Sequence, residues 1–319
     1  MTESTRPSLC ILIPVFNEAE ALPMLVPRVL AALADVPAEL RLLLVDDGSS
    51  DGSGEQLARL AAQDDRIGYL RLARNFGKEI AMSAGLDVAD ADAVVLLDAD
   101  LQDPPEVVRE FWKYFEQGYD NVYGVRSSRA GETALKKVTA AGFYRVIDRM
   151  SRTPIPRDTG DFRLLSRRAV MALRQLRERN RFMKGLFGWV GFRSIGVPYE
   201  RAPRVAGTSK FNYWKLWNFA LEGITSFSTA PLRLATYIGA GTAGIAFLFG
   251  AWIVFKTLAY GESVRGYPSL MVVMLFLGGV QLIALGLIGE YLGRLFEESK
   301  MRPLYLVDEV RLPRAGQSD

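Results

Sequence analysis

The chain has 319 residues, 49% of them hydrophobic, and its 39 Lys and Arg residues nearly balance its 36 Asp and Glu residues, for a formal net charge of +3. A charge so close to balance does not favour a nucleic-acid partner. The chain has no histidine, which excludes Ser-His-Asp and Cys-His catalysis and every histidine-based metal site. The one cysteine, Cys10, lies in an apolar run and is interpreted as a core residue, so no disulfide framework is possible.

Strand patterns alternate with helix patterns from the N-terminus, which predicts an α/β fold with a mostly parallel sheet and right-handed crossovers. Buried strands are expected at 9–15, 40–45, 67–72 and 94–97, and helices after the first strand to about residue 33, over 54–63, and after the third strand to about residue 87. Further along, we expect helices over 104–117, 134–150 and 167–176 and strands over 120–125, just after Asp161, and over 195–199.

Polar residues follow each of the first four predicted strands. The carboxyl ends of parallel strands meet at one edge of an open sheet, where such folds bind ligands. One polar strand end is ordinary, but four in succession indicate a shared cleft. The residues are Asn17 and Glu18, Asp46 and Asp47, Asn75 and Lys78, and Asp98 and Asp100.

The fourth strand ends in Asp98-Ala99-Asp100-Leu101-Gln102, followed by Asp103 and a Pro-Pro pair. Two carboxylates and an amide are hard oxygen ligands, which suit Mg²⁺ or Mn²⁺ bound together with substrate phosphates. The plainer alternative is a strand-end turn with solvated aspartates. No Gly-x-Gly-x-x-Gly follows the first strand and no Gly-Lys-Ser/Thr occurs, so a dinucleotide dehydrogenase or P-loop enzyme is not favoured.

The C-terminal third of the chain has the pattern of a membrane protein. No charged residue occurs over 234–255 or 266–289, and each segment is long enough to cross a hydrocarbon core of about 30 Å. We therefore predict two transmembrane helices, at about 234–256 and 267–290. Basic residues flank the first span and follow the second, which places the N-terminal domain and the tail on the cytoplasmic side.

This division predicts four parts: a catalytic domain over 1–210, an amphipathic juxtamembrane segment over 211–232, the two spans over 233–293, and a cytoplasmic tail over 294–319. The basic pattern over 134–150 suits a helix on anionic lipid and equally a solvated helix packed on the core. A short strand over 304–310 invites pairing with another subunit, which leaves a homo-oligomer open.

Five motifs together resemble the family 2 glycosyltransferases of GT-A fold. They are Ile13-Pro14-Val15-Phe16-Asn17-Glu18, Val45-Asp46-Asp47-Gly48-Ser49-Ser50-Asp51, Arg74-Asn75-Phe76-Gly77-Lys78, Asp98-Ala99-Asp100-Leu101-Gln102-Asp103-Pro104-Pro105-Glu106 and Gly207-Thr208-Ser209-Lys210-Phe211. More narrowly, the chain is similar to the polyprenyl-phosphate glycosyltransferases, which include dolichol-phosphate mannose synthase and the bacterial bactoprenol glucosyltransferases. The two spans favour the bacterial branch, and with it the bacterial inner membrane.

The resemblance implies a role for each matching residue. Asp98, Asp100 and Gln102 would bind the divalent metal, with Asp100 its most direct ligand. Asp161 would be the catalytic carboxylate, with Asp158 its rival. Pro14, Phe16, Glu18 and Ala99 would contact the nucleotide sugar, Asp46 or Asp47 would bind its base or ribose, and Lys78 would lie near the base. Arg204 and Lys210 would belong to a loop that closes on the donor diphosphate. Arg126 and Arg129 would hold the acceptor phosphate.

The implied reaction is an inverting transfer of glucose from UDP-glucose to undecaprenyl phosphate, with the nucleoside diphosphate leaving. An acceptor phosphate is largely ionised near neutral pH, so Asp161 can be a base, an orienting group or only a helix cap. Other donors, namely GDP-mannose, UDP-N-acetylglucosamine or an aminosugar nucleotide, stay open. A polysaccharide synthase is not favoured, because the chain lacks Gln-x-x-Arg-Trp. A non-enzymatic membrane scaffold is the alternative of another class.

Overall fold

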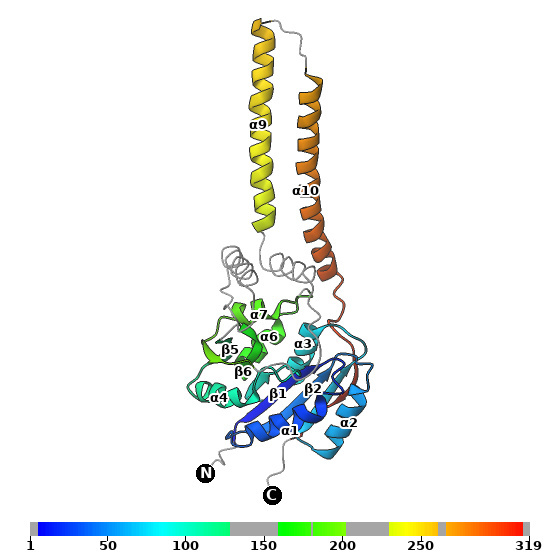
Figure 1. Ribbon diagram of the computed structural model, residues 1–319, viewed down its shortest axis with the longest axis vertical. Coiled ribbons are helices and arrows are strands. Elements are labelled where there is room, and N and C mark those ends of the chain that lie inside the picture. The colour runs from blue at the N-terminus through cyan, green and yellow to red at the C-terminus, as the bar shows by residue number, and fades with distance from the viewer. Residues whose placement is uncertain (1–5, 128–158, 180, 202–229, 261–265, 315–319) are drawn as a thin grey trace.

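The computed structural model describes residues 6–127, 159–179, 181–201, 230–260 and 266–314 (Figure 1). The predicted basic helix over 134–150 lies outside the described residues, as does the juxtamembrane segment as far as residue 229. The described part is an α/β domain from which two long helices project (Figure 1).

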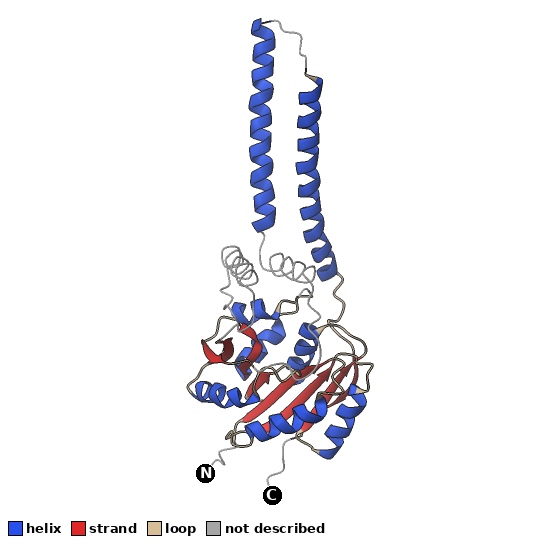
Figure 2. Ribbon diagram, in the orientation of Figure 1, coloured by secondary structure: helices blue, strands red, loops and turns tan. Residues whose placement is uncertain are grey.

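Eight strands form one sheet in the order β7-β5-β6-β4-β1-β2-β3-β8 (Figure 2). The pairs of β1 with β2 and β4, of β2 with β3, and of β5 with β7 are parallel, whereas β6 runs antiparallel to β4 and β5. The predicted mostly parallel sheet is therefore confirmed in the half that carries the first four strands. The strands are β1 Ser8–Val15, β2 Glu39–Asp46, β3 Ile67–Leu72, β4 Ala93–Leu96, β5 Asn121–Arg126, β6 Thr159–Ser166, β7 Ser194–Tyr199 and β8 Val307–Arg311.

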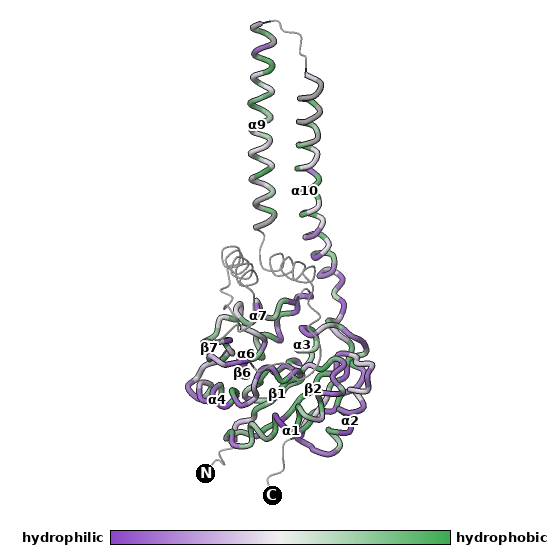
Figure 3. The backbone as a smooth tube through the Cα atoms, viewed as in Figure 1, coloured by the Kyte–Doolittle hydropathy of each residue, from purple (hydrophilic) through white to green (hydrophobic). Residues whose placement is uncertain are grey.

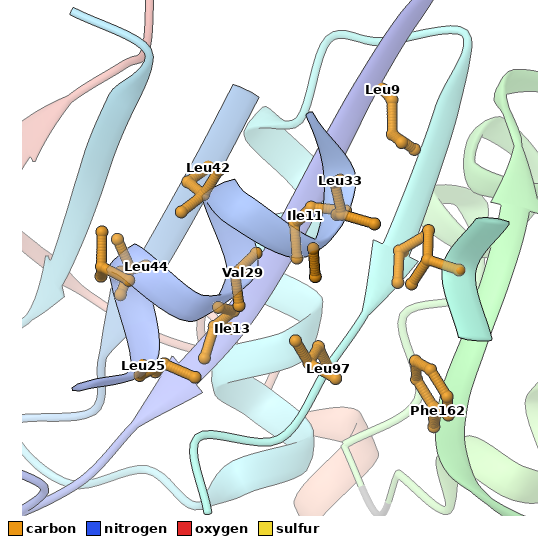
Figure 4. Packing of buried hydrophobic residues seen from close by; sticks show 14 of the residues in the cluster. Leu9, Ile11, Ile13, Leu25, Val29, Leu33, Leu42, Leu44, Leu97 and Phe162 are labelled. Atoms are coloured by element: carbon orange, nitrogen blue, oxygen red, sulfur yellow. The ribbon is translucent and has the colours of Figure 1, made fainter. Parts of the chain in front are cut away.

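Helices cover both faces of this sheet, because successive apolar side chains along each strand point to opposite faces. In β1, Leu9, Ile11 and Ile13 pack with α1 on one face (Figure 4), while Cys10 and Leu12 pack with α3 on the other. Burial on both faces gives the continuous apolar runs that the sequence shows. The helices of the domain are α1 Leu22–Leu33, α2 Ser53–Gln63, α3 Lys78–Val88, α4 Val108–Glu116, α6 Arg167–Gln175 and α7 Met183–Trp189.

Two element boundaries differ from the predictions. The helix expected over 104–117 opens as a 3-10 turn, η1 Pro105–Val107, and continues as α4, since prolines suit a first turn but donate no backbone hydrogen bond. Strand β6 begins at Thr159 rather than after Asp161. Its first residues gain pairing with β5, and Phe162 packs against Phe111, with ring centroids 4.8 Å apart.

The strand expected over 304–310 is present as β8, but its partner is β3 of the same chain, with antiparallel register. The Tyr69 hydroxyl donates to Glu309, and the Tyr305 hydroxyl donates to Asp87 at 2.8 Å. The C-terminal segment thus covers an edge of the chain's own sheet.

The helices α9, Ala230–Tyr260, and α10, Tyr267–Ser299, project together from the domain (Figures 1 and 3). Both are long and apolar enough to cross a membrane, over 235–260 and 276–299, and neither window is buried within the chain. Large apolar side chains such as Phe247 and Trp252 are exposed, as a lipid-facing helix requires. Figure 3 shows hydrophilic residues returning at the domain end of α10, where Glu298 accepts a hydrogen bond from the Arg179 backbone at 2.6 Å.

Candidate active site

The loops after β1 and β2 are joined by hydrogen bonds that explain their polar sequences. Asn17, at a positive φ of 54°, accepts from the Ser50 backbone at 2.9 Å, and its own backbone N–H donates to Ser49 Oγ at 2.9 Å. The Glu18 backbone donates to Ser53 Oγ at 3.0 Å. Phe16 stands exposed beside this junction. Two of the predicted strand ends therefore form one preorganised surface.

Asp46 and Asp47 are both buried, and each braces a loop. Asp47 accepts hydrogen bonds from the backbone of Phe76 at 2.7 Å and of Gly77 at 2.9 Å, after β3. Asp46 accepts from the Ser49 backbone at 2.9 Å, and its other oxygen faces the Arg71 guanidinium at 3.6 Å. Burial raises the pKa of Asp47, although the two backbone donors oppose it.

Gly48, between these loops, has a φ of +68°, and a side chain there would lie 2.4 Å from the Arg74 backbone. Only glycine tolerates both the left-handed backbone and this approach, so Gly48 lets the second and third strand ends meet.

The centre of the site is an ammonium held between two carboxylates. Lys78 Nζ, at the first residue of α3, lies 2.6 Å from Asp98 at the end of β4 and 2.7 Å from Asp161 in β6. The sequence analysis expected Lys78 near the base. Its side chain links the first aspartate of the Asp-x-Asp to the carboxylate that the resemblance marked as catalytic.

The two carboxylates differ in their electrostatic surroundings. Burial raises the pKa of Asp98, and the charges of Asp161 and Asp103 add to that effect. Burial would also raise the pKa of Asp161, but the charges of Lys78, Lys184 and Arg163 outweigh it and hold the pKa below its ordinary value. Asp161 is therefore firmly ionised, whereas at Asp98 burial outweighs the opposing effect of the Lys78 ammonium.

The turn after β4 carries the other predicted metal ligands. Asp100 accepts from the Gln102 backbone at 3.1 Å, and Leu101 between them adopts a positive φ of 56°. Ala99, which the resemblance placed at the nucleotide sugar, is buried in the core.

Within the described ranges, no group of three acidic, histidine or cysteine side chains is arranged to hold a metal ion. The donors still fit a hard cation, since Mg²⁺ is usually bound by one or two carboxylates together with substrate phosphates.

Arg126, at the end of β5, contributes a further cation to the site. Its guanidinium lies beside the Tyr199 hydroxyl, which donates to the buried Asp103 at 2.5 Å. Arg126 Nε is buried and, within the described part of the chain, has no hydrogen-bond partner. Gly160 makes room for this arginine, because a side chain there would lie 3.1 Å from the guanidinium.

Sequence reasoning missed four residues around this site: Asp103, Arg163, Lys184 and Tyr199. Arg163 lies two residues beyond Asp161, on the same face of β6, donates to the Gly160 carbonyl at 2.9 Å and stacks 3.7 Å from the Phe187 ring. Burial lowers the pKa of Arg163 to about 10. The period-two spacing from Asp161 was the available signal for Arg163. Asp103 belongs to the motif over 98–106 but received no role there, and Lys184 and Tyr199 belong to none of the five motifs.

Of the remaining predicted site residues, Pro14 and Glu18 lie at the end of β1 and in the loop after it. Arg129, Asp158, Arg204 and Lys210 lie outside the described residues.

Comparison with known proteins agrees with this architecture. Residues 10–174 match the glycosyl transferase family 2 domain, and residues 230–295 match the GtrB C-terminal hairpin. The chain is 50% identical over 299 residues to the bactoprenol glucosyl transferase of Shigella phage SfV, covering 94% of this chain and 97% of that protein. It is 46% identical over 303 residues to the prophage bactoprenol glucosyl transferase homolog of Escherichia coli K12, covering 95% and 99%.

Among solved structures, a mannosyltransferase from Pyrobaculum calidifontis superposes with a TM-score of 0.45 at 16% identity, covering 88% of each chain. The family match and the relatives' coverage establish that the chain belongs to glycosyl transferase family 2, the enzyme class that the sheet and its acidic turn had indicated. The sheet is the GT-A type of this family, and the two apolar helices associate it with a membrane.

Proposed function

We propose that the protein transfers glucose from UDP-glucose to the phosphate of a polyprenyl phosphate, giving a lipid-linked sugar for cell-surface polysaccharide modification. The observation that carries this proposal is the Lys78-centred pair of carboxylates facing Arg126, in a domain tethered to two apolar helices. The relatives named bactoprenol glucosyl transferases support both the sugar and the lipid carrier.

In this proposal, a phosphate oxygen of the acceptor attacks the anomeric carbon as the bond from that carbon to the UDP oxygen breaks. UDP leaves, the configuration inverts, and no covalent enzyme intermediate forms. The nucleotide lies over the joined loops after β1 and β2, near Pro14, Phe16 and Glu18. Asp98, Asp100 and Gln102 would hold a Mg²⁺ or Mn²⁺ ion, which would supply a Lewis acid for the departing diphosphate.

Asp161 acts as an ionised orienting group. A phosphate monoester has a second pKa of about 6 and needs no strong base near neutral pH. The cations around Asp161 hold its pKa low, so it is a weak proton acceptor. Its carboxylate fixes Lys78 and keeps the cationic wall in place for the acceptor.

The domain and tail face the cytoplasm of a bacterial inner membrane that both helices cross. Arg294, Lys300 and Arg302 near the domain end of α10 support this orientation, since basic residues favour the cytoplasmic side. Arg129, Arg204 and Lys210 remain proposed contacts to the acceptor and donor phosphates.

A donor panel tests the proposed function. Purified protein in detergent is incubated with undecaprenyl phosphate, Mg²⁺ or Mn²⁺, and one labelled donor at a time: UDP-glucose, UDP-galactose, UDP-N-acetylglucosamine or GDP-mannose. We expect label from UDP-glucose in the organic phase and its loss with EDTA. Label from a different donor corrects the sugar. No label from any donor, with folded protein, contradicts the enzyme and favours the scaffold.

A further inference from the structure

Lys184 lies on α7, a helix that the sequence analysis did not predict. The first turn of α7 is fixed to α3, because the Met183 backbone donates to Glu79 Oε2 at 2.9 Å. Ser83, one turn further along α3, also donates to the Met183 sulfur at 3.8 Å. Glu79 follows Lys78 in the chain, so these contacts place the start of α7 beside the Lys78 cluster.

The same helix packs on β6 at the functional carboxylate. Phe187 stacks with Arg163, which lies two residues from Asp161 on the strand. Lys184 and Phe187 are three residues apart in the helix and so share a face. This face brings the Lys184 charge within interaction range of Asp161, Arg126, Lys78 and Arg163.

Lys184 has no counter-ion of its own in the described part of the chain. Among the residues that the structure describes, it forms neither an ion pair nor a hydrogen bond, although it is half-buried. The carboxylate it faces, Asp161, is already bound by Lys78 at 2.7 Å. Burial lowers the pKa of Lys184, and the neighbouring cations add to this while Asp161 opposes it.

Two cations with spare donors therefore converge on one side of Asp161. Among the described residues, neither the buried Nε of Arg126 nor the ammonium of Lys184 has a hydrogen-bond partner. Desolvated cations are costly unless an anion pairs with them. A phosphate, with several acceptor oxygens, satisfies both at once.

The place of α7 in the fold favours the lipid phosphate over the donor diphosphate. The helix lies on the side of the domain from which α9 and α10 project (Figure 1). A lipid headgroup from the membrane therefore approaches α7 first. We propose that Lys184, together with Arg126, binds the phosphate of the lipid acceptor opposite Asp161, an inference that rests on the proposed transfer reaction.

Steady-state kinetics with farnesyl phosphate as a short acceptor test this role. Lys184→Met should raise the KM for farnesyl phosphate by about ten- to a hundredfold and leave the KM for the nucleotide sugar within about twofold. Lys184→Arg, which keeps the charge, should recover most of the affinity. The matched control is Lys113→Met, because Lys113 is an exposed lysine on α4 paired only with Glu110 in the described residues. An equal rise in both KM values, or no change, overturns the inference.

A binding measurement separates this inference from the transfer reaction itself. The affinity for farnesyl phosphate is measured for wild type and Lys184→Met without donor, with farnesol as the uncharged control. We expect the substitution to weaken farnesyl phosphate about tenfold or more and leave farnesol unchanged. If wild type transfers sugar but both proteins bind farnesyl phosphate equally, the role of Lys184 is wrong. If wild type binds the phosphate through Lys184 but transfers no sugar, the proposed reaction is wrong and the binding site stands.

Discussion

The two halves of the sheet carry their polar groups in different ways. In the parallel half, β3-β2-β1-β4, each strand ends directly in a short polar motif, and neighbouring motifs meet. In the mixed half, β6-β5-β7, Asp161 lies within a strand, Arg126 ends another, and Lys184 comes from a helix packed across them.

The halves also differ in how far their polar groups satisfy one another. Asn17 pairs with Ser50, and Asp47 with the backbone after β3, so the loops of the parallel half are braced before any ligand arrives. In the described part of that half, the buried atom without a hydrogen-bond partner is an acceptor, Asp46 Oδ2, which faces Arg71. In the mixed half, Arg126 Nε and Lys184 have spare donors within the described residues. This contrast indicates a preformed nucleotide surface beside a cationic site that an anion completes.

The largest expected effect comes from the turn that ends the parallel half. Asp100→Ala should lower the transfer rate by roughly a thousandfold, because it removes an oxygen ligand of the divalent ion that would neutralise the departing diphosphate. Membrane insertion should be unchanged. Asp35→Ala is the control, since Asp35 is an exposed aspartate near Arg109. Activity of Asp100→Ala near that of wild type removes Asp100 from the metal site.

Lys78 joins the halves, and its removal should affect both. Lys78→Met should lower kcat by about a hundredfold, because Asp98 and Asp161 then face each other without the ammonium that both contact. The KM for donor and acceptor should both change, unlike in Lys184→Met. A change confined to one substrate would place Lys78 in one half alone.

The pH profile separates an orienting Asp161 from a basic one. The value of kcat/KM for the acceptor should fall about tenfold per pH unit below about pH 6, as the free lipid phosphate takes up its second proton. Asp161 stays ionised there, because its pKa is held below the ordinary value and its protonation begins only at lower pH. Asp161→Asn should therefore lower the rate without moving this acid limb. Loss of the limb in Asp161→Asn would identify Asp161 as the titrating group.

The smallest effect is expected at Gly160. Gly160→Ala places a methyl group 3.1 Å from the Arg126 guanidinium, which must shift by a few tenths of an ångström. We expect a rise of about threefold in the acceptor KM and an unchanged donor KM. Gly244→Ala in α9 is the control, because a side chain there meets no atom within 4 Å. Unchanged kinetics in Gly160→Ala would show that Arg126 does not need its observed position.

The same contrast explains what could be predicted from the sequence. The strands over 9–15 and 67–72, and the Asp98-x-Asp100 turn, are local patterns of apolar runs followed by polar residues, so reading the chain was enough to find them. The link from Lys78 to Asp161 joins residues far apart in the chain, and no local pattern encodes it. Asp103 and Tyr199 meet because β7 pairs beside β5. The pairing of β8 with β3 was equally open, because the pattern of a single strand does not indicate which strand it pairs with.

The most direct test of the two-part site is the pair of KM values for Arg126→Ala, measured with UDP-glucose and with undecaprenyl phosphate. If the mixed half holds the lipid phosphate, the acceptor KM should rise about tenfold or more while the donor KM stays within about twofold. An equal rise in both would move Arg126 out of the acceptor site and contradict the division of the sheet into a donor half and an acceptor half.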